Sequence, residues 1–321
     1  PPNKDLIMSS YQYIFSLENL SKTWPGGKTL FENINLSFLP NAKIGVVGLN
    51  GSGKSTFLKI LSGIDKEFNG EIISAKGIKI GYLPQEPELD PAKNVYDNVC
   101  EGAKDKLSLI EKYNDLSMNY SDEIADDLAK LQDEIEAKEL WDLDSKIELA
   151  MDALRCPDKD KNINNLSGGE KRRIAICKLL LEEPDLLLMD EPTNHLDPET
   201  VAWLENYLKN YNGTVILITH DRFFLDNITE WILELDRGKA IPYEGNYSKW
   251  LTQKQKRIEL ETKHENARLR RLKSEVNWIS SSPKARQSKS KARINNYEAL
   301  LNTENVQSID DPQIICLLYT S

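Results

Sequence analysis

The chain has 321 residues, of which 40% are apolar, so it is long enough for one large domain with additions or for two domains. Its four cysteines form no C-x-x-C pair, which argues against a disulfide framework or a zinc site and favours a reducing, cytoplasmic location. No apolar run reaches the roughly 18–20 residues of a membrane helix, so we expect no membrane-spanning segment.

The charge is unevenly distributed along the chain. The formal net charge is −10, yet residues 252–301 carry 13 Lys or Arg and 5 Asp or Glu, which leaves −18 for the rest. This division predicts a basic appendage on an acidic body. At the other end, residues 1–7 precede Met8, and we interpret them as an upstream extension.

The first motif is a glycine-rich loop between an apolar run, residues 44–47, and a helical pattern, residues 56–61. It matches the P-loop pattern G-x-x-x-x-G-K-[ST], in which backbone N–H groups surround phosphates. Lys54 is expected to reach the β- and γ-phosphates, and Ser55 to offer a hydroxyl to Mg²⁺. A chance glycine-rich turn is disfavoured by the order of strand, loop and helix. The expected nucleotide-binding residues are Gly48, Asn50, Gly51, Ser52, Gly53, Lys54, Ser55 and Thr56.

An acidic helical region follows, with 15 Asp or Glu and 6 Lys or Arg between residues 101 and 148. Within it, four apolar residues recur at helical spacing. These are Ile124, Leu128, Leu131 and Ile135. We predict an inserted helical arm at about residues 95–145. The alternative is an ordinary helical subdomain.

The second half of the phosphate site is "DLLLMDEP". Residues 186–189 predict a buried strand that ends in Asp190 and Glu191. A carboxylate in this position beside a P-loop holds Mg²⁺, a role that fits Asp190. Glu191 is then placed to orient or deprotonate an attacking water. The alternative, an acidic turn after a strand, is disfavoured beside a P-loop.

Three further motifs complete an ordered set: "YLPQ" with Gln85, "LSGGEKRR" at residues 166–173, and "ILITHD" with His220. Over residues 11–250 this set resembles the ATP-binding cassette family. The resemblance implies an α/β fold, a P-loop NTPase cassette with a mixed sheet flanked by helices and a helical subdomain. We therefore place the cassette domain at residues 8–250.

The resemblance also implies roles for the other motif residues. Ser167, Gly168 and Gly169 would contact the γ-phosphate of an opposite cassette. Gln85 would link the Mg²⁺ site to the helical subdomain, and His220 would contact the γ-phosphate. In these terms the catalytic residues are Glu191, His220 and Gln85, and the metal ligands are Ser55, Gln85 and Asp190.

The same resemblance assigns roles to two more residues and implies that two cassettes form one complete site. Asp197 stands where the family has its cross-dimer loop. Trp24 is the candidate for stacking on adenine, although a plain packing role is the alternative. Because the chain has one P-loop and one LSGGE motif, a complete site requires a homodimer or a second cassette.

The pattern of apolar residues in the basic appendage predicts a helical hairpin. One helical stripe is Leu269, Leu272, Val276 and Ile279, and a second is Ile294, Tyr297 and Leu301. The intervening "SSSPKARQSKS" contains a proline and several serines, so we expect a loop there. Its cations suit phosphate backbones, and a solvated linker is the alternative. The expected RNA-binding residues are Lys284, Arg286, Lys289, Lys291 and Arg293.

With this segment included, the chain resembles the ABC-F group of soluble translation factors. The resemblance implies that residues 251–302 form a tRNA-interaction motif between two cassettes. It implies ATP-dependent binding to the ribosomal E site, contacts with P-site tRNA and 23S rRNA, an arm directed at the L1 stalk, and a response to ATP/ADP. Residues 303–321 depart from the group and form a tail of uncertain origin. The alternatives are the ATPase subunit of a membrane transporter and an RNA-binding fragment that hydrolyses no ATP.

Overall fold

The computed structural model describes residues 13–24, 26–27, 29–119, 125–280 and 313–315. The chain divides into two compact units, one formed by residues 1–247 with 314–321 and the other by residues 248–313.

The centre of the first unit is a six-stranded sheet in the order β5-β6-β7-β3-β8-β9, in which β9 alone is antiparallel to its neighbour. The strands β6 and β7 are buried at every residue, because a parallel sheet is covered on both faces. The bounds are β3 (Lys43–Gly48), β5 (Ile80–Leu83), β6 (Leu186–Asp190), β7 (Thr214–Ile218), β8 (Trp231–Asp236) and β9 (Lys239–Glu244). The apolar runs at residues 44–47 and 186–189 are therefore strands, as predicted.

A second sheet has the order β10-β2-β1-β4. Its strands are β1 (Phe15–Thr23), β2 (Thr29–Phe38), β4 (Asn69–Ser74) and the short β10 (Gln313–Ile315). One apolar core joins this sheet to the central sheet and to helix α1 (Lys54–Leu61). Within that core, the ring of Phe31 on β2 meets the ring of Phe57 on α1 edge to face at 6.0 Å. The fold is thus the α/β cassette with flanking helices that the motifs predicted.

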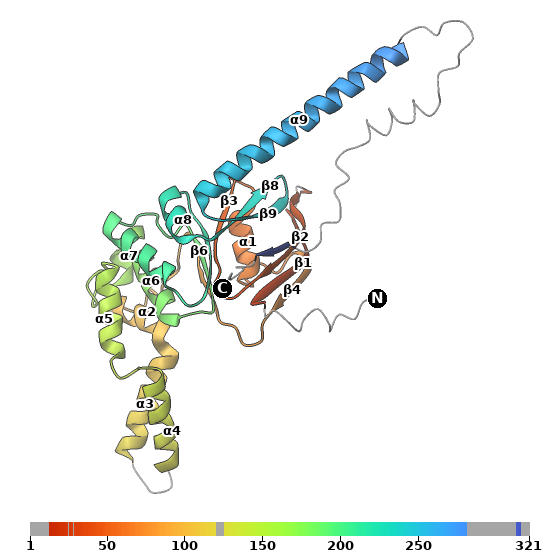
Figure 1. The fold of residues 1–321 in the computed structure, drawn as a ribbon. Coiled ribbons are helices and arrows are strands. Elements are labelled where there is room, and N and C mark those ends of the chain that lie inside the picture. Colours follow the sequence, from red (N-terminus) through yellow and green to blue (C-terminus); the bar gives the residue numbers. More distant parts are fainter. Residues whose placement is uncertain (1–12, 25, 28, 120–124, 281–312, 316–321) are drawn as a thin grey trace, which may run out of the picture. The chain divides into compact units, whose positions relative to one another are not determined.

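The helical part of this unit gathers beside the central sheet (Figure 1). Its helices are α2 (Val95–Cys100), η2 (Glu101–Ala103), α5 (Leu143–Ala153), α6 (Gly168–Glu182), α7 (Pro198–Lys209) and α8 (Arg222–Ile228). A hairpin of α3 (Lys104–Met118) and α4 (Ala125–Ala137) projects from it. Within its described part, this hairpin has only Ile135 fully buried, so it is a thin, solvated arm. Leu128 and Leu131 are half-buried, and Ile124 lies outside the described residues.

Gly102 lets η2 approach α6 closely. A Cβ at this position would lie 2.0 Å from the carbonyl oxygen of Lys178. We expect Gly102→Ala to lower the free energy of unfolding by about 1–3 kcal/mol, because the two helices must separate. Denaturant unfolding measures this change. The control is Gly168→Ala, whose added Cβ meets no described atom within 4 Å. An unchanged free energy for Gly102→Ala would contradict the close packing.

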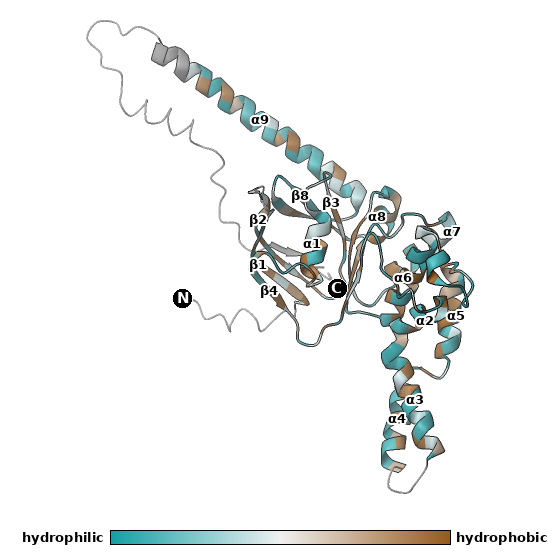
Figure 2. Ribbon diagram, turned by 180° about the vertical axis from the view of Figure 1, so that it is seen from behind, coloured by the Kyte–Doolittle hydropathy of each residue, from teal (hydrophilic) through white to brown (hydrophobic). Residues whose placement is uncertain are grey.

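The second unit contains most of a long helix, α9 (Tyr247–Ser280), which holds the first predicted stripe. Figure 2 shows α9 as largely hydrophilic with apolar residues recurring along it. Among them, Leu269 is 52% exposed. The five basic residues from Lys284 to Arg293 and the second stripe, residues 294–301, lie outside the described residues, so the hairpin stays a prediction.

Candidate functional site

The carboxyl ends of four neighbouring parallel strands bring the P-loop, the Asp190–Glu191 pair, His220 and Gln85 to one edge of the central sheet. The P-loop follows β3, and Asp190 ends β6. His220 lies two residues beyond β7, and Gln85 two residues beyond β5. This edge is where doubly wound sheets bind ligands.

The side chain of Lys54 folds back over the P-loop that precedes it. The Lys54 ammonium donates to the carbonyl oxygens of Gly48 at 2.9 Å and Leu49 at 3.1 Å. Burial lowers the pKa of Lys54, against the opposing attraction of Glu191 and Asp190. A charged phosphate at this point would supply the counter-charge that a partly buried ammonium needs.

Two features of the loop fit a bound phosphate. The hydroxyl of Ser52 is buried and, within the described part of the chain, has no hydrogen-bond partner. Gly53 caps α1 in the left-handed region, with φ 96°, so the first turn opens directly from the loop. Ser55 and Thr56 lie in that turn, where backbone N–H groups and the helix dipole favour an anion. Asn50 and Gly51 lie on the exposed rim.

Glu191 forms the acidic centre of the site. It is 6% exposed and adopts a left-handed φ of 53°, directly after Asp190, which is 2% exposed. One oxygen of Glu191 accepts from the His220 backbone N–H at 3.2 Å, and the other lies 3.4 Å from His220 Nε2. Burial raises the pKa of Glu191, and the nearby His220 partly opposes this. A buried carboxylate with a raised pKa suits a general base.

Arg172 joins the signature helix α6 to this centre, and the sequence analysis missed it. The side chain is 2% exposed. One terminal nitrogen donates to the carbonyl of Gln85, and the other to those of Asp190, at 2.5 Å, and Glu191. Its position four residues before the buried Ile176 places it on the inner face of α6, a signal available in the sequence.

The LSGGE residues lie elsewhere in the cassette. Ser167 caps α6, and its hydroxyl accepts from the Glu170 N–H at 3.3 Å, while a Glu170 oxygen accepts from the Ser167 N–H at 2.8 Å. Gly168 and Gly169 form the first turn. Both views place α6 with the helices and α1 against the strands (Figures 1 and 2). One chain therefore presents its P-loop and its LSGGE loop on different parts of the cassette.

Asp197, Trp24 and Gln85 are the remaining predicted site residues. Asp197 caps α7 by accepting from Thr200 N–H at 3.1 Å and from its hydroxyl at 2.7 Å, hydrogen bonds that lower its pKa. Trp24 directly follows β1 and is 51% exposed, so its ring is accessible. The side chain of Gln85 is exposed, and its backbone is anchored by Arg172. Their roles toward a nucleotide stay predictions.

Comparison with known families agrees with this geometry. The family model described as ABC transporter matches residues 31–194, and a second model with the same description matches residues 233–315. The chain belongs to the ABC transporter family. It is an ATP-binding cassette with an extension beyond the cassette.

Individual relatives within this family show a higher similarity to the chain. It is 50% identical over 301 residues to the energy-dependent translational throttle protein EttA of Haemophilus influenzae, covering 92% of this chain and 54% of the relative. It is 48% identical to EttA of Escherichia coli K12, with 91% and 54% coverage. It is also 58% identical over 206 residues to the ATP-binding protein ChvD of Rhizobium radiobacter, with 64% and 72% coverage. The chain spans about half the length of the EttA relatives.

Solved structures support the fold. A dimeric ATP-binding cassette bound to ADP and phosphate matches with a TM-score of 0.51 and 25% identity, covering 72% of this chain and 98% of that one. The cassette cbiO1 of Clostridium perfringens matches with a TM-score of 0.51 and 26% identity, covering 75% and 92%.

Proposed function

We propose that the chain is an ATP-hydrolysing ABC-F translation factor that binds the ribosome and changes translation elongation in response to ATP/ADP. The observation that carries this proposal is the roughly 50% identity to EttA across 92% of the chain, together with a complete set of motif residues. As expected for a translation factor, we place it in the cytoplasm.

The proposed chemistry uses the carboxyl edge of the central sheet. Lys54 and the P-loop amides hold the phosphates of ATP, and Ser55, Asp190 and Gln85 would hold Mg²⁺. The metal would supply charge neutralisation on the phosphates. Glu191 accepts a proton from the attacking water, and His220 keeps that carboxylate oriented through the two contacts described above.

A complete site is proposed to need a second cassette or a second copy of this chain. The LSGGE loop at the start of α6 and the P-loop before α1 lie on different parts of the unit, which supports a site shared between two cassettes. Solved relatives include a cassette dimer bound to ADP and phosphate. ATP binding would close the pair, and hydrolysis would reopen it.

The proposed ribosomal contacts are the E site, P-site tRNA and 23S rRNA through the basic segment at residues 284–293, and the L1 stalk region through the arm. The rival proposal is the ATPase subunit of a membrane transporter, which leaves the basic segment without a role. Among the helices that the structure describes, none combines the length and apolar character needed to cross a membrane.

Co-sedimentation with purified ribosomes across a salt series tests the RNA contact. The variant replaces Lys284, Arg286, Lys289, Lys291 and Arg293 by Ala. We expect weaker binding, with a salt slope shallower by up to about 4, because fewer counterions are released. The control replaces five exposed lysines of the cassette, Lys59, Lys66, Lys76, Lys159 and Lys209, and should retain the slope. Equal effects of both variants would contradict a contact specific to the basic segment.

A further inference from the structure

A surface groove of about 600 Å³ lies at the opposite edge of the central sheet from the P-loop. One wall is the turn that leads into β6, with Glu183, Pro184 and Asp185, and the other is the end of α7 with the turn into β7. Because both turns precede parallel strands, the groove is separate from the nucleotide site.

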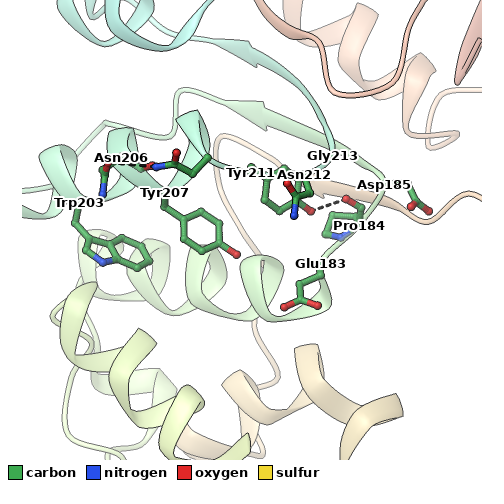
Figure 3. Close-up of a pocket in the computed structure, with 10 residues that line it drawn as sticks. Glu183, Pro184, Asp185, Trp203, Asn206, Tyr207, Tyr211, Asn212 and Gly213 are labelled. Atoms are coloured by element: carbon green, nitrogen blue, oxygen red, sulfur yellow. Dashed lines mark hydrogen bonds between the residues drawn. The ribbon is translucent and has the colours of Figure 1, made fainter. Parts of the chain in front are cut away.

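Three aromatic rings form a ladder along one wall. Trp203, Tyr207 and Tyr211 recur at intervals of four residues, and each is half-buried. The centroids of Trp203 and Tyr207 are 5.3 Å apart with the rings nearly parallel, and those of Tyr207 and Tyr211 are 5.9 Å apart. Figure 3 shows the three rings following one another along the groove, and the Tyr211 hydroxyl donates a hydrogen bond to the Pro184 carbonyl. Three adjoining, partly exposed rings present a continuous surface for a ligand.

The opposite wall favours positive charge. The helix α6 ends at Glu182, so its carbonyl groups and the negative end of its dipole point toward the groove. Glu183 and Asp185 add carboxylates. One cation of the chain already uses this corner: the Lys106 ammonium lies 2.7 Å from Glu183 and donates to the Leu181 carbonyl at 3.1 Å.

A second cation of the chain lies at the other end of the ladder. The Lys43 ammonium donates to the carbonyls of Tyr211 and Gly213, both at 2.7 Å, and lies 5.8 Å from the centre of the Tyr211 ring. Burial raises the pKa of Tyr207 to about 12, and the nearby Glu183 adds to this. Groove residues thus contact two ammonium groups of the chain: Glu183 contacts Lys106, and Tyr211 and Gly213 contact Lys43, whose pKa burial lowers to about 8.

Amide side chains run beside the rings. Asn206 and Asn212 line the groove, and a side-chain amide both donates and accepts, as the backbone of an extended peptide requires. We propose that this groove binds an extended basic peptide segment of a partner protein. Its arginine or lysine stems lie across the rings of Trp203 and Tyr207, and its backbone bonds to these amides.

The groove disfavours two other occupants. Nucleic-acid bases stack on aromatic rings, but phosphates would meet Glu183 and the carboxyl end of α6. An apolar helix would bury the asparagine amides and the carboxylates without partners. The proposal does not depend on ATP hydrolysis or on ribosome binding.

Fluorescence anisotropy of a labelled decapeptide of alternating arginine and glycine tests the proposal on the intact chain at low salt. We expect the arginine peptide to bind. A peptide with citrulline in place of arginine should bind at least about tenfold more weakly, because citrulline has a similar shape but no charge. Trp203→Ala and Glu183→Gln should each weaken it at least about fivefold. The matched controls, Phe223→Ala and Glu71→Gln, remove an exposed aromatic and an exposed carboxylate elsewhere and should change it less than twofold.

Binding of ATP should be unchanged in every variant, which shows that the chain remains folded. Equal binding of the citrulline peptide would overturn the proposal, as would equal loss in the two controls. Displacement of the peptide by single-stranded RNA, with the same sensitivity to Trp203→Ala, would show a nucleic-acid surface instead and would also overturn it.

Discussion

Glu191→Gln is expected to lower the rate of ATP hydrolysis by about 10²- to 10⁴-fold while ATP still binds. The amide cannot accept a proton from water, yet it retains the shape of the side chain and its contact with the His220 N–H. Single-turnover hydrolysis measures the rate, and a fluorescent ATP analogue measures binding. The experiment uses conditions in which the wild-type chain hydrolyses ATP, with a second cassette supplied if the chain alone has no activity.

The pH dependence of ATP hydrolysis provides a second test of the role of Glu191. Because burial raises the pKa of Glu191, the base becomes protonated at a higher pH than a free glutamate would, so wild-type activity should fall earlier on acidification. The residual activity of the variant should lack this acid limb. Glu86→Gln, an exposed neighbour of Gln85, is the control. Hydrolysis by Glu191→Gln within a few-fold of wild type would exclude Glu191 as the base.

Arg172→Met is expected to lower the free energy of unfolding by about 3–5 kcal/mol and to reduce kcat more than it changes KM for ATP. The substitution leaves the carbonyls of Gln85, Asp190 and Glu191 without this donor, and the last two of these hydrogen bonds are buried. The loop that carries Glu191, the proposed general base, would then relax, whereas the P-loop keeps its own contacts. Steady-state hydrolysis and denaturant unfolding provide the two measurements.

Two neighbouring substitutions sharpen this test. Arg173→Met removes a side chain that donates to the Arg155 carbonyl at 2.9 Å near the surface, so it should cost no more than about 1 kcal/mol. Arg172→Lys retains the charge without the planar fork and should restore part of the stability and less of kcat. Equal effects of Arg172→Met and Arg173→Met would contradict the anchoring role.

The motifs predicted the central sheet and the nucleotide edge because glycines and apolar runs there have strict local requirements. A buried parallel strand needs unbroken apolar residues, as at 186–189, and a phosphate loop needs glycines, as at Gly53. The antiparallel sheet was not anticipated, since its strands carry exposed polar residues and its pairing depends on distant segments. Its β1 pairs with both β2 and β4.

Arg172 illustrates why the other parts of the site could not be predicted from the sequence. It stands in the LSGGEKRR motif between Lys171 and Arg173, which are half-buried, and a charged side chain is rarely fully buried. Only the folded chain shows that the ends of β5 and β6 place three carbonyls where its guanidinium can reach them. The groove escaped for a similar reason: the aromatic spacing is visible along α7, but the wall at residues 183–185 comes from a distant turn.

The most direct test of the central claim is co-sedimentation of the Glu191→Gln chain with purified ribosomes in ATP, in ADP and without nucleotide. Blocked hydrolysis should hold the cassette in its ATP-bound state, so we predict recovery with ribosomes in ATP and little in the other two conditions. Recovery that is equal in all three conditions would contradict an ATP-gated ribosome factor.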